Sequence, residues 1–180
     1  MILTEQLREE NARVRTILKI LEKLSEKIDS DEKVGYRDLS DIVELAEIFG
    51  QRHHQKKEED LLLSAMEQSA VHEYDVLALL LSRHSAIRKA FREMKEAVAK
   101  YHAVDGTARS AASQTMKVYC ELFGEHLDTA ESEFYAGLDT RFTREKQDEL
   151  IEGFNALDRS DANRPTELQN LEKLSHAYLK

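Results

Sequence analysis

Four long segments of this chain carry apolar side chains at intervals of three and four residues. Its only proline is Pro165, and it holds six glycines, so little of the sequence supplies the turns that a sheet protein needs. Apolar residues at this spacing lie along one face of an α-helix. We therefore predict helices at residues 4–29, 38–68, 73–102 and 108–138.

Short connections join these segments. Residues 30–36, which contain Gly35, are predicted to form a turn, and a tight connection has Gly106 as its pivot. Long helices with short connections favour an antiparallel up-down-up-down four-helix bundle. The predicted fold class is all-α, with the bundle in residues 1–140.

Residues 141–180 are predicted to form an additional C-terminal helical extension. It contains a helix at 144–157, a polar break at 158–164 and a last helix that begins at Thr166. Two arrangements remain open. The extension packs on the bundle, or it forms the interface of a homodimer.

The charge of the chain narrows the classes of partner. Asp and Glu outnumber Lys and Arg by 35 to 26, giving a net charge of -9 at pH 7, which disfavours nucleic acid and anionic membrane surfaces. No apolar run approaches the length of a membrane span, and the first residues lack the pattern of a secretory signal. The single Cys120 cannot form an internal disulfide. We expect a cytoplasmic protein with no nucleic-acid or membrane partner.

The segment His54-Gln-Lys-Lys-Glu58 places an imidazole and a carboxylate four residues apart. On an α-helix both side chains project from one face, and Leu61 continues that face into the bundle interior. A buried imidazole and carboxylate are costly unless a metal or hydrogen bonds satisfy them. The apolar stripe that arrives through Phe49, however, continues to His53, so either the face drifts or a local bulge intervenes. Which histidine points inward stays open. Three neighbours are expected to form a solvated face: Lys56, Lys57 and Glu59.

Two other helices each carry one histidine in the apolar stripe. His84 follows Leu80 by four residues, and His126 follows Phe123 by three. A single histidine there is more often a hydrogen-bonded core residue than a ligand. Three helices with a histidine at matching levels favour metal binding over a satisfied polar core.

A faint repeat relates the two halves of the chain. Asn11 precedes His54 by 43 residues, and His84 precedes His126 by 42. Each half offers one ligand position on its first helix and a His-x-x-x-carboxylate pattern on its second. Asn11 stands at a histidine position in the first half, and Ala130 stands at the carboxylate position in the second.

These residues resemble the hemerythrin-like, or HHE cation-binding, family over about residues 3–138. HQKKEEDLLL and EHLDTAESEF are similar to its His-x-x-x-Glu signatures, and RHSAIR is similar to its single-histidine helix. The resemblance implies a four-helix bundle that holds one or two non-haem irons and binds or senses O2 or NO or handles iron. The ligands that it implies, including a helix-four carboxylate one residue after Ala130, are His54, Glu58, His84, His126 and Glu131.

Asn11 and Ala130 depart from the family pattern and leave a two-iron site incomplete. Imidazole and carboxylate ligands also suit zinc or manganese. The alternative to a gas-binding or iron-handling protein is a metal-free or single-metal bundle with a structural or protein-interaction role. An iron oxidase is the least favoured class, because it requires two metals.

Overall fold

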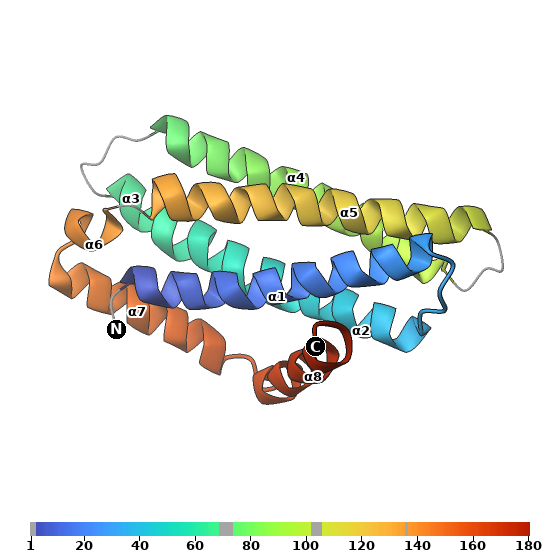
Figure 1. The fold of residues 1–180 in the computed structure, drawn as a ribbon. Coiled ribbons are helices and arrows are strands. Elements are labelled where there is room, and N and C mark those ends of the chain that lie inside the picture. The colour runs from blue at the N-terminus through green and yellow to red at the C-terminus, as the bar shows by residue number, and fades with distance from the viewer. Residues whose placement is uncertain (1–2, 69–73, 102–105, 136) are drawn as a thin grey trace.

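The computed structural model describes residues 3–68, 74–101, 106–135 and 137–180 (Figure 1). Every regular element within these ranges is helical, as the all-α prediction required. The elements, in chain order, are α1 (Leu3–Asp29), α2 (Tyr36–Leu45), η1 (Ala46–Gln55), η2 (Lys57–Leu63), α3 (Ser64–Gln68), α4 (Tyr74–Ala99), α5 (Gly106–Thr129), η3 (Ala130–Phe134), α6 (Leu138–Arg141), α7 (Arg144–Arg159) and α8 (Arg164–Tyr178).

Four helical rods form an antiparallel bundle. The first rod is α1, the second runs from α2 to α3, the third is α4, and the fourth is α5 with η3. Successive rods run in opposite directions in Figure 1. α5 packs against both α1 and α4, while η1 packs against α1. The up-down-up-down prediction is confirmed. The predicted connection around Gly106 is only partly described. Residues 102–105 lie outside the described ranges, and Gly106 is the first residue of α5.

The second rod differs from the continuous α-helix predicted at 38–68. After α2 it is wound as two π-helical stretches, η1 and η2, before α3 returns to α-helix. π-helical hydrogen bonds span five residues instead of four, so each turn contains more residues. Both His53 and His54 are consequently buried, at 3% and 1% exposure. The sequence left open whether a local bulge reconciles the two apolar stripes, and the π-helical winding is that bulge.

A polar layer divides the interior of the bundle. Along α1, the larger apolar cluster begins at Val14, while Leu7 belongs to a second cluster, and the buried Asn11 lies between them. In α4, His84 lies between Leu80 of the second cluster and Ile87 of the first. Apolar packing on both sides therefore holds this layer of polar side chains away from solvent.

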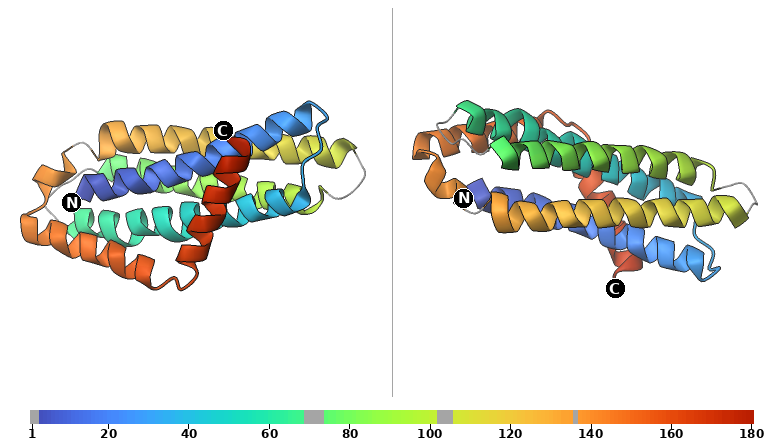
Figure 2. Two further views of the ribbon diagram at one scale, coloured as in Figure 1. Left: turned by 60° about the horizontal axis from the view of Figure 1, so that its bottom comes forward. Right: turned by 90° about the horizontal axis from the view of Figure 1, so that it is seen from above.

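The C-terminal helices cover one side of the bundle. α7 contacts α1 and η2, and α8 crosses α1 and α2 at a steep angle (Figure 2). Leu171 and Leu174 of α8 join the larger apolar cluster. The break between α7 and α8 covers only residues 160–163, which is shorter than the predicted 158–164.

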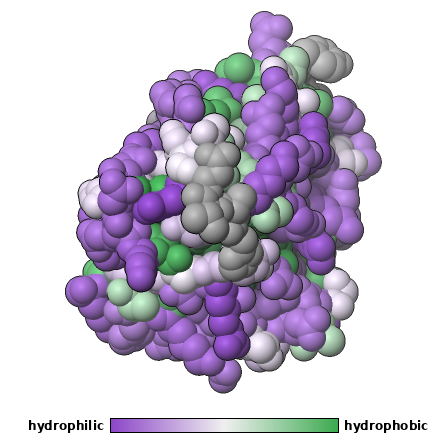
Figure 3. All heavy atoms as spheres, turned by 90° about the vertical axis from the view of Figure 1, so that its right-hand side faces the viewer, coloured by the Kyte–Doolittle hydropathy of each residue, from purple (hydrophilic) through white to green (hydrophobic). Residues whose placement is uncertain are grey.

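One end of the molecule is mostly hydrophilic. Figure 3 shows the end where α1 finishes and α2 begins, with apolar atoms visible mainly between polar side chains. Among the helices of the described ranges, none has both the length and the apolarity required to cross a bilayer.

Candidate metal centre

Three imidazoles from three rods meet one carboxylate in the polar layer. Glu58 Oε2 lies 3.6 Å from His54 Nε2, 2.9 Å from His84 Nε2 and 3.2 Å from His126 Nε2. His126 Nε2 also lies 3.2 Å from His54 Nε2 and 3.3 Å from His84 Nε2. All four side chains are at most 1% exposed. The structure thus brings together four of the five residues that the sequence singled out.

Aromatic packing orients two of these imidazoles. The ring of Phe123 lies 5.5 Å from the ring of His54 and 5.9 Å from that of His126, centroid to centroid. Phe123 in turn packs edge-on against Tyr119, at 5.7 Å. Gly50 faces this aromatic pair, and the lack of a side chain there lets η1 approach α5 closely.

Burial sets the protonation states of the cluster. It lowers the pKa of His54 to about 3, against the opposing effect of the Glu58 carboxylate, so this imidazole is neutral at physiological pH. Burial by itself would raise the pKa of Glu58, but the neighbouring imidazoles outweigh it and hold that pKa well below its usual range. Glu58 is therefore a carboxylate, which is the form that coordinates a cation.

Glu59 binds the ring nitrogen of His84 that does not face Glu58. Its Oε1 lies 2.7 Å from His84 Nδ1 and accepts a second hydrogen bond from Arg88 Nη1 at 2.6 Å. Burial opposes ionisation of Glu59, but the hydrogen bonds with Arg88 and His84 prevail and lower its pKa. An ionised Glu59 accepts the Nδ1 proton of His84, and in that tautomer Nε2 is the nitrogen that can bind a cation. The sequence-based expectation of a solvated Glu59 missed this contact.

Tyr135 supports the carboxylate. Its hydroxyl donates a hydrogen bond of 2.5 Å to Glu58 Oε1, the oxygen that does not face the imidazoles. Burial, followed by the charge of Glu58, raises the pKa of Tyr135 well above its usual value, so the hydroxyl keeps its proton. Sequence reasoning did not find this residue, because Tyr135 and Glu58 are 77 residues apart and no local pattern relates them.

Glu131 makes other contacts. Its Oε1 accepts a hydrogen bond from Asn11 Nδ2 at 2.8 Å and lies 3.4 Å from Arg15 Nη2. A third of its side chain is exposed. The two family departures are thereby linked, since Asn11 stands at a histidine position and binds the carboxylate that follows Ala130.

The donor set fits one divalent cation. One ligand atom each from His54, Glu58 and His126 lies within 4.8 Å of the others. His84 Nε2 lies 2.9 Å from Glu58 Oε2 and 3.3 Å from His126 Nε2. Three imidazoles with one carboxylate suit iron, zinc or manganese. In the described part of the chain, the Nδ1 atoms of His54 and His126 have no protein hydrogen-bond partner.

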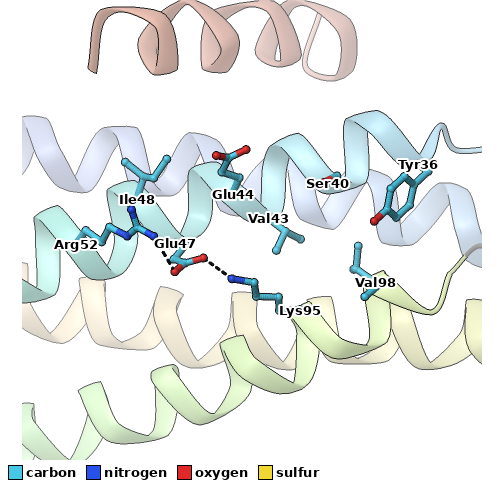
Figure 4. A pocket seen from close by; sticks show the side chains of 10 residues that line it. Tyr36, Ser40, Val43, Glu44, Glu47, Ile48, Arg52, Lys95 and Val98 are labelled. Atoms are coloured by element: carbon cyan, nitrogen blue, oxygen red, sulfur yellow. Dashed lines mark hydrogen bonds and ion pairs between the residues drawn. The ribbon is translucent and has the colours of Figure 1, made fainter. Parts of the chain in front are cut away.

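A separate pocket lies between the second rod and α4. It has a volume of about 390 Å³ and none of the four clustered residues lines it. Figure 4 shows Glu47 at its wall, bonded to Arg52 at 3.1 Å and to Lys95 at 2.6 Å. This pocket has no ligand-type imidazole and is distinct from the candidate metal centre.

Comparison with known proteins bears on the same residues. A family model described as the hemerythrin HHE cation binding domain matches residues 2–138. No significant match was found among curated proteins or among solved structures. The matched region spans the whole bundle and includes each residue of the imidazole and carboxylate cluster. The chain therefore belongs to the hemerythrin HHE cation-binding domain family.

Proposed function

We propose that this protein binds one iron ion through His54, Glu58, His84 and His126 and uses it to bind or sense O2 or NO. The observation that carries the proposal is the convergence of three imidazole Nε2 atoms on Glu58 Oε2. Family membership supports a cation at this place. The acidic charge and the single cysteine support a cytoplasmic location.

Two contacts support one metal in preference to two. A second ion would need the other oxygen of Glu58, which accepts the hydrogen bond from Tyr135. It would also need Glu131, which is bound by Asn11 and lies beside Arg15. Contacts within the protein therefore occupy the two carboxylate groups that a second ion would need.

The protein residues would control what reaches the metal. Iron held by four protein ligands keeps positions open for a small neutral gas. The apolar clusters on both sides of the polar layer exclude larger polar molecules, while Glu59 and Tyr135 hold His84 and Glu58 in their coordinating orientations.

Metal analysis of purified protein tests the proposal. We expect about one iron per chain in the wild type, little in His54→Ala and His84→Ala, and wild-type content in the control His176→Ala, which removes an exposed histidine of α8. Equal iron in all four proteins would refute the site assignment.

The gas is tested on the reduced, iron-loaded protein. Addition of NO or O2 should change the iron absorption spectrum of the wild type and of His176→Ala. A full iron content without a spectral change would favour iron handling. A protein that contains no metal, and whose melting is unchanged by chelators, would favour the structural, protein-interaction alternative.

A further inference from the structure

A second group of ligand-type side chains includes His53, the neighbour of His54, and lies where the C-terminal extension meets the bundle. His53, Asp161 and Glu167 each offer one ligand atom, and the three atoms lie within 4.8 Å of one another. His53 Nε2 lies 3.1 Å from Asp161 Oδ2. His53 comes from η1, Asp161 from the break after α7, and Glu167 from the first turn of α8.

The cations of this region are bound mainly to a neighbouring carboxylate. Asp158 lies 2.7 Å from Lys57 Nζ and 3.1 Å from Arg164 Nη2. Lys57 is also paired with Glu10. Asp161 and Glu167 lie close to each other and to the imidazole of His53, and Arg164 is the cation nearest to this group.

Two close carboxylates make their negative charges costly. Burial, and then the charge of Asp161, raise the pKa of Glu167. Glu167 Oε2 is inaccessible to solvent and has no hydrogen-bond partner within the described residues. A buried carboxylate oxygen without a partner is a costly feature, and a cation at this position removes the cost.

The other ring nitrogen of His53 lies beside a carboxylate and a guanidinium group. Asp158 Oδ1 lies 3.2 Å from His53 Nδ1. Burial opposes ionisation of Asp158, but bonds to His53 and Lys57 lower its pKa to about 2, so it is an ionised acceptor. A carboxylate close to the second ring nitrogen is a common feature of metal-binding histidines. Arg164 Nη1 donates a hydrogen bond to His53 Nδ1 at 3.1 Å, and Nε2 is the ring nitrogen that faces Asp161.

The group is reachable from solvent. His53, Asp161 and Glu167 line a surface pocket of about 330 Å³, together with Asn163 and Lys56. The pocket has room for the water molecules that would complete the coordination of an ion held by three protein ligands.

We propose that His53, Asp161 and Glu167 form a second divalent-cation site, of the zinc or manganese class, at the junction of η1 and α8. One imidazole nitrogen and two carboxylate oxygens are ligands that these ions accept. The bound ion joins the start of α8 to the helix that carries His54. The site uses residues outside the ligand set of the candidate metal centre, and Asp161 and Glu167 lie outside the family match.

Zinc binding to chelator-treated protein tests this site. By equilibrium dialysis we expect about two zinc ions per chain in the wild type and about one in Asp161→Asn/Glu167→Gln. The control Asp148→Asn/Glu149→Gln removes two exposed carboxylates of α7 and should keep both ions. Equal zinc content in the wild type and in Asp161→Asn/Glu167→Gln would overturn the proposal.

The same dialysis experiment can refute either site assignment without refuting the other. His84→Ala should lose the central ion and keep the one at α8. If the wild type and His84→Ala each bind one zinc and Asp161→Asn/Glu167→Gln binds none, the central site is wrong and the site at α8 stands. If Asp161→Asn/Glu167→Gln and the wild type each bind one and His84→Ala binds none, the site at α8 is wrong.

Hydrogen exchange on the unmodified chain gives a second readout that does not depend on a variant folding. An ion at this junction stabilises the closed position of α8, so zinc should slow amide exchange in residues 161–170. The same slowing should occur in His84→Ala. Unchanged exchange in this segment at saturating zinc would also overturn the proposal.

Discussion

His53 and His54 are adjacent in the chain but face different elements. His54 Nε2 lies 3.6 Å from Glu58 Oε2 inside the bundle, while His53 Nε2 lies 3.1 Å from Asp161 Oδ2 beside α8. Both imidazoles are buried, because the π-helical winding of η1 directs two successive side chains into two different packed regions. The metal centre and the C-terminal extension are therefore connected through one peptide bond.

Removing the Tyr135 hydroxyl should weaken metal binding without removing a ligand. Tyr135→Phe deletes the hydrogen bond to Glu58 Oε1 and frees that carboxylate to rotate. Partners of metal ligands typically contribute about 10-fold to 100-fold in affinity, and we expect a loss in that range. The measurement is competition for the metal against a chelator. Tyr119→Phe also removes a buried hydroxyl but does not contact Glu58, so it should bind metal as the wild type does.

Removing Glu59 should affect the metal through His84. Glu59→Ala deletes the acceptor that holds the His84 proton on Nδ1, and it also frees Arg88. We expect metal affinity to fall by roughly 10-fold or more, because Nε2 then no longer presents its lone pair in a fixed tautomer. The exposed neighbour gives the control, Asp60→Ala. Equal affinities of the two variants would show that Glu59 does not position His84.

A methyl group at Gly50 should destabilise the bundle. A Cβ there would lie 2.8 Å from Phe123 Cε1 and 3.0 Å from the Tyr119 hydroxyl, so the aromatic pair behind the imidazoles would have to shift. We expect Gly50→Ala to cost about 1–3 kcal/mol in the free energy of unfolding, measured by urea denaturation. Gly124→Ala is the matched control. A Cβ on Gly124 meets nothing within 4 Å, and replacement of a helical glycine by alanine should stabilise by about 0.5–1 kcal/mol. Destabilisation of both variants by the same amount would argue against the close approach.

Glu47 should make the stability of the bundle depend on pH. Its hydrogen bond with Lys95 is the largest influence that lowers its pKa from the ordinary value of 4.5, and Arg52 adds to it (Figure 4). A carboxyl group whose pKa is lower in the folded than in the unfolded state stabilises the protein above the ordinary pKa. This contribution is lost as the pH falls through the lowered value. We expect Glu47→Gln to be less stable than the wild type by about 0.5–1 kcal/mol at pH 7.

The difference should shrink as the pH is lowered from about 5 to below 4, and also at high salt, which screens the ion pairs. Thermal melts of both proteins across this pH range provide the measurement. Glu44→Gln, on the same rod and the same pocket wall, serves as the control. A difference that stays constant down to acid pH would mean that the charge of Glu47 is not the cause.

Much of the architecture was predictable from the sequence, because the apolar spacing of each rod is a local property. His84 and His126 could be found in the same way, since each interrupts an apolar stripe near the middle of its rod. The winding of the second rod was not predictable, because three-and-four spacing fits an α-helix equally well. The only sign of it was the conflict between the stripe that leads to His53 and the one that begins at His54.

The side chains that contact the ligands depend on tertiary packing. Lys57 was expected to be solvated, and this was wrong, since it is fully buried and paired with Glu10 of α1 and Asp158 of α7. No pattern near Lys57 in the sequence indicates that it pairs with Asp158, which lies 101 residues further along the chain. Tyr135 could not be found for the same reason, because its role requires the end of the fourth rod to meet the middle of the second.

The π-helical winding makes the second rod unusually sensitive to its length. An α-helix turns by about 100° per residue, so deletion of a single codon between Ala46 and Leu63 would rotate one flank of the rod against the other unless the wide turn reverts to α-helix. A reverted helix has one inward direction at this level and could present only one imidazole of the pair to the interior. Length variation in this segment would thus separate docking of the C-terminal helices from assembly of the central imidazole cluster.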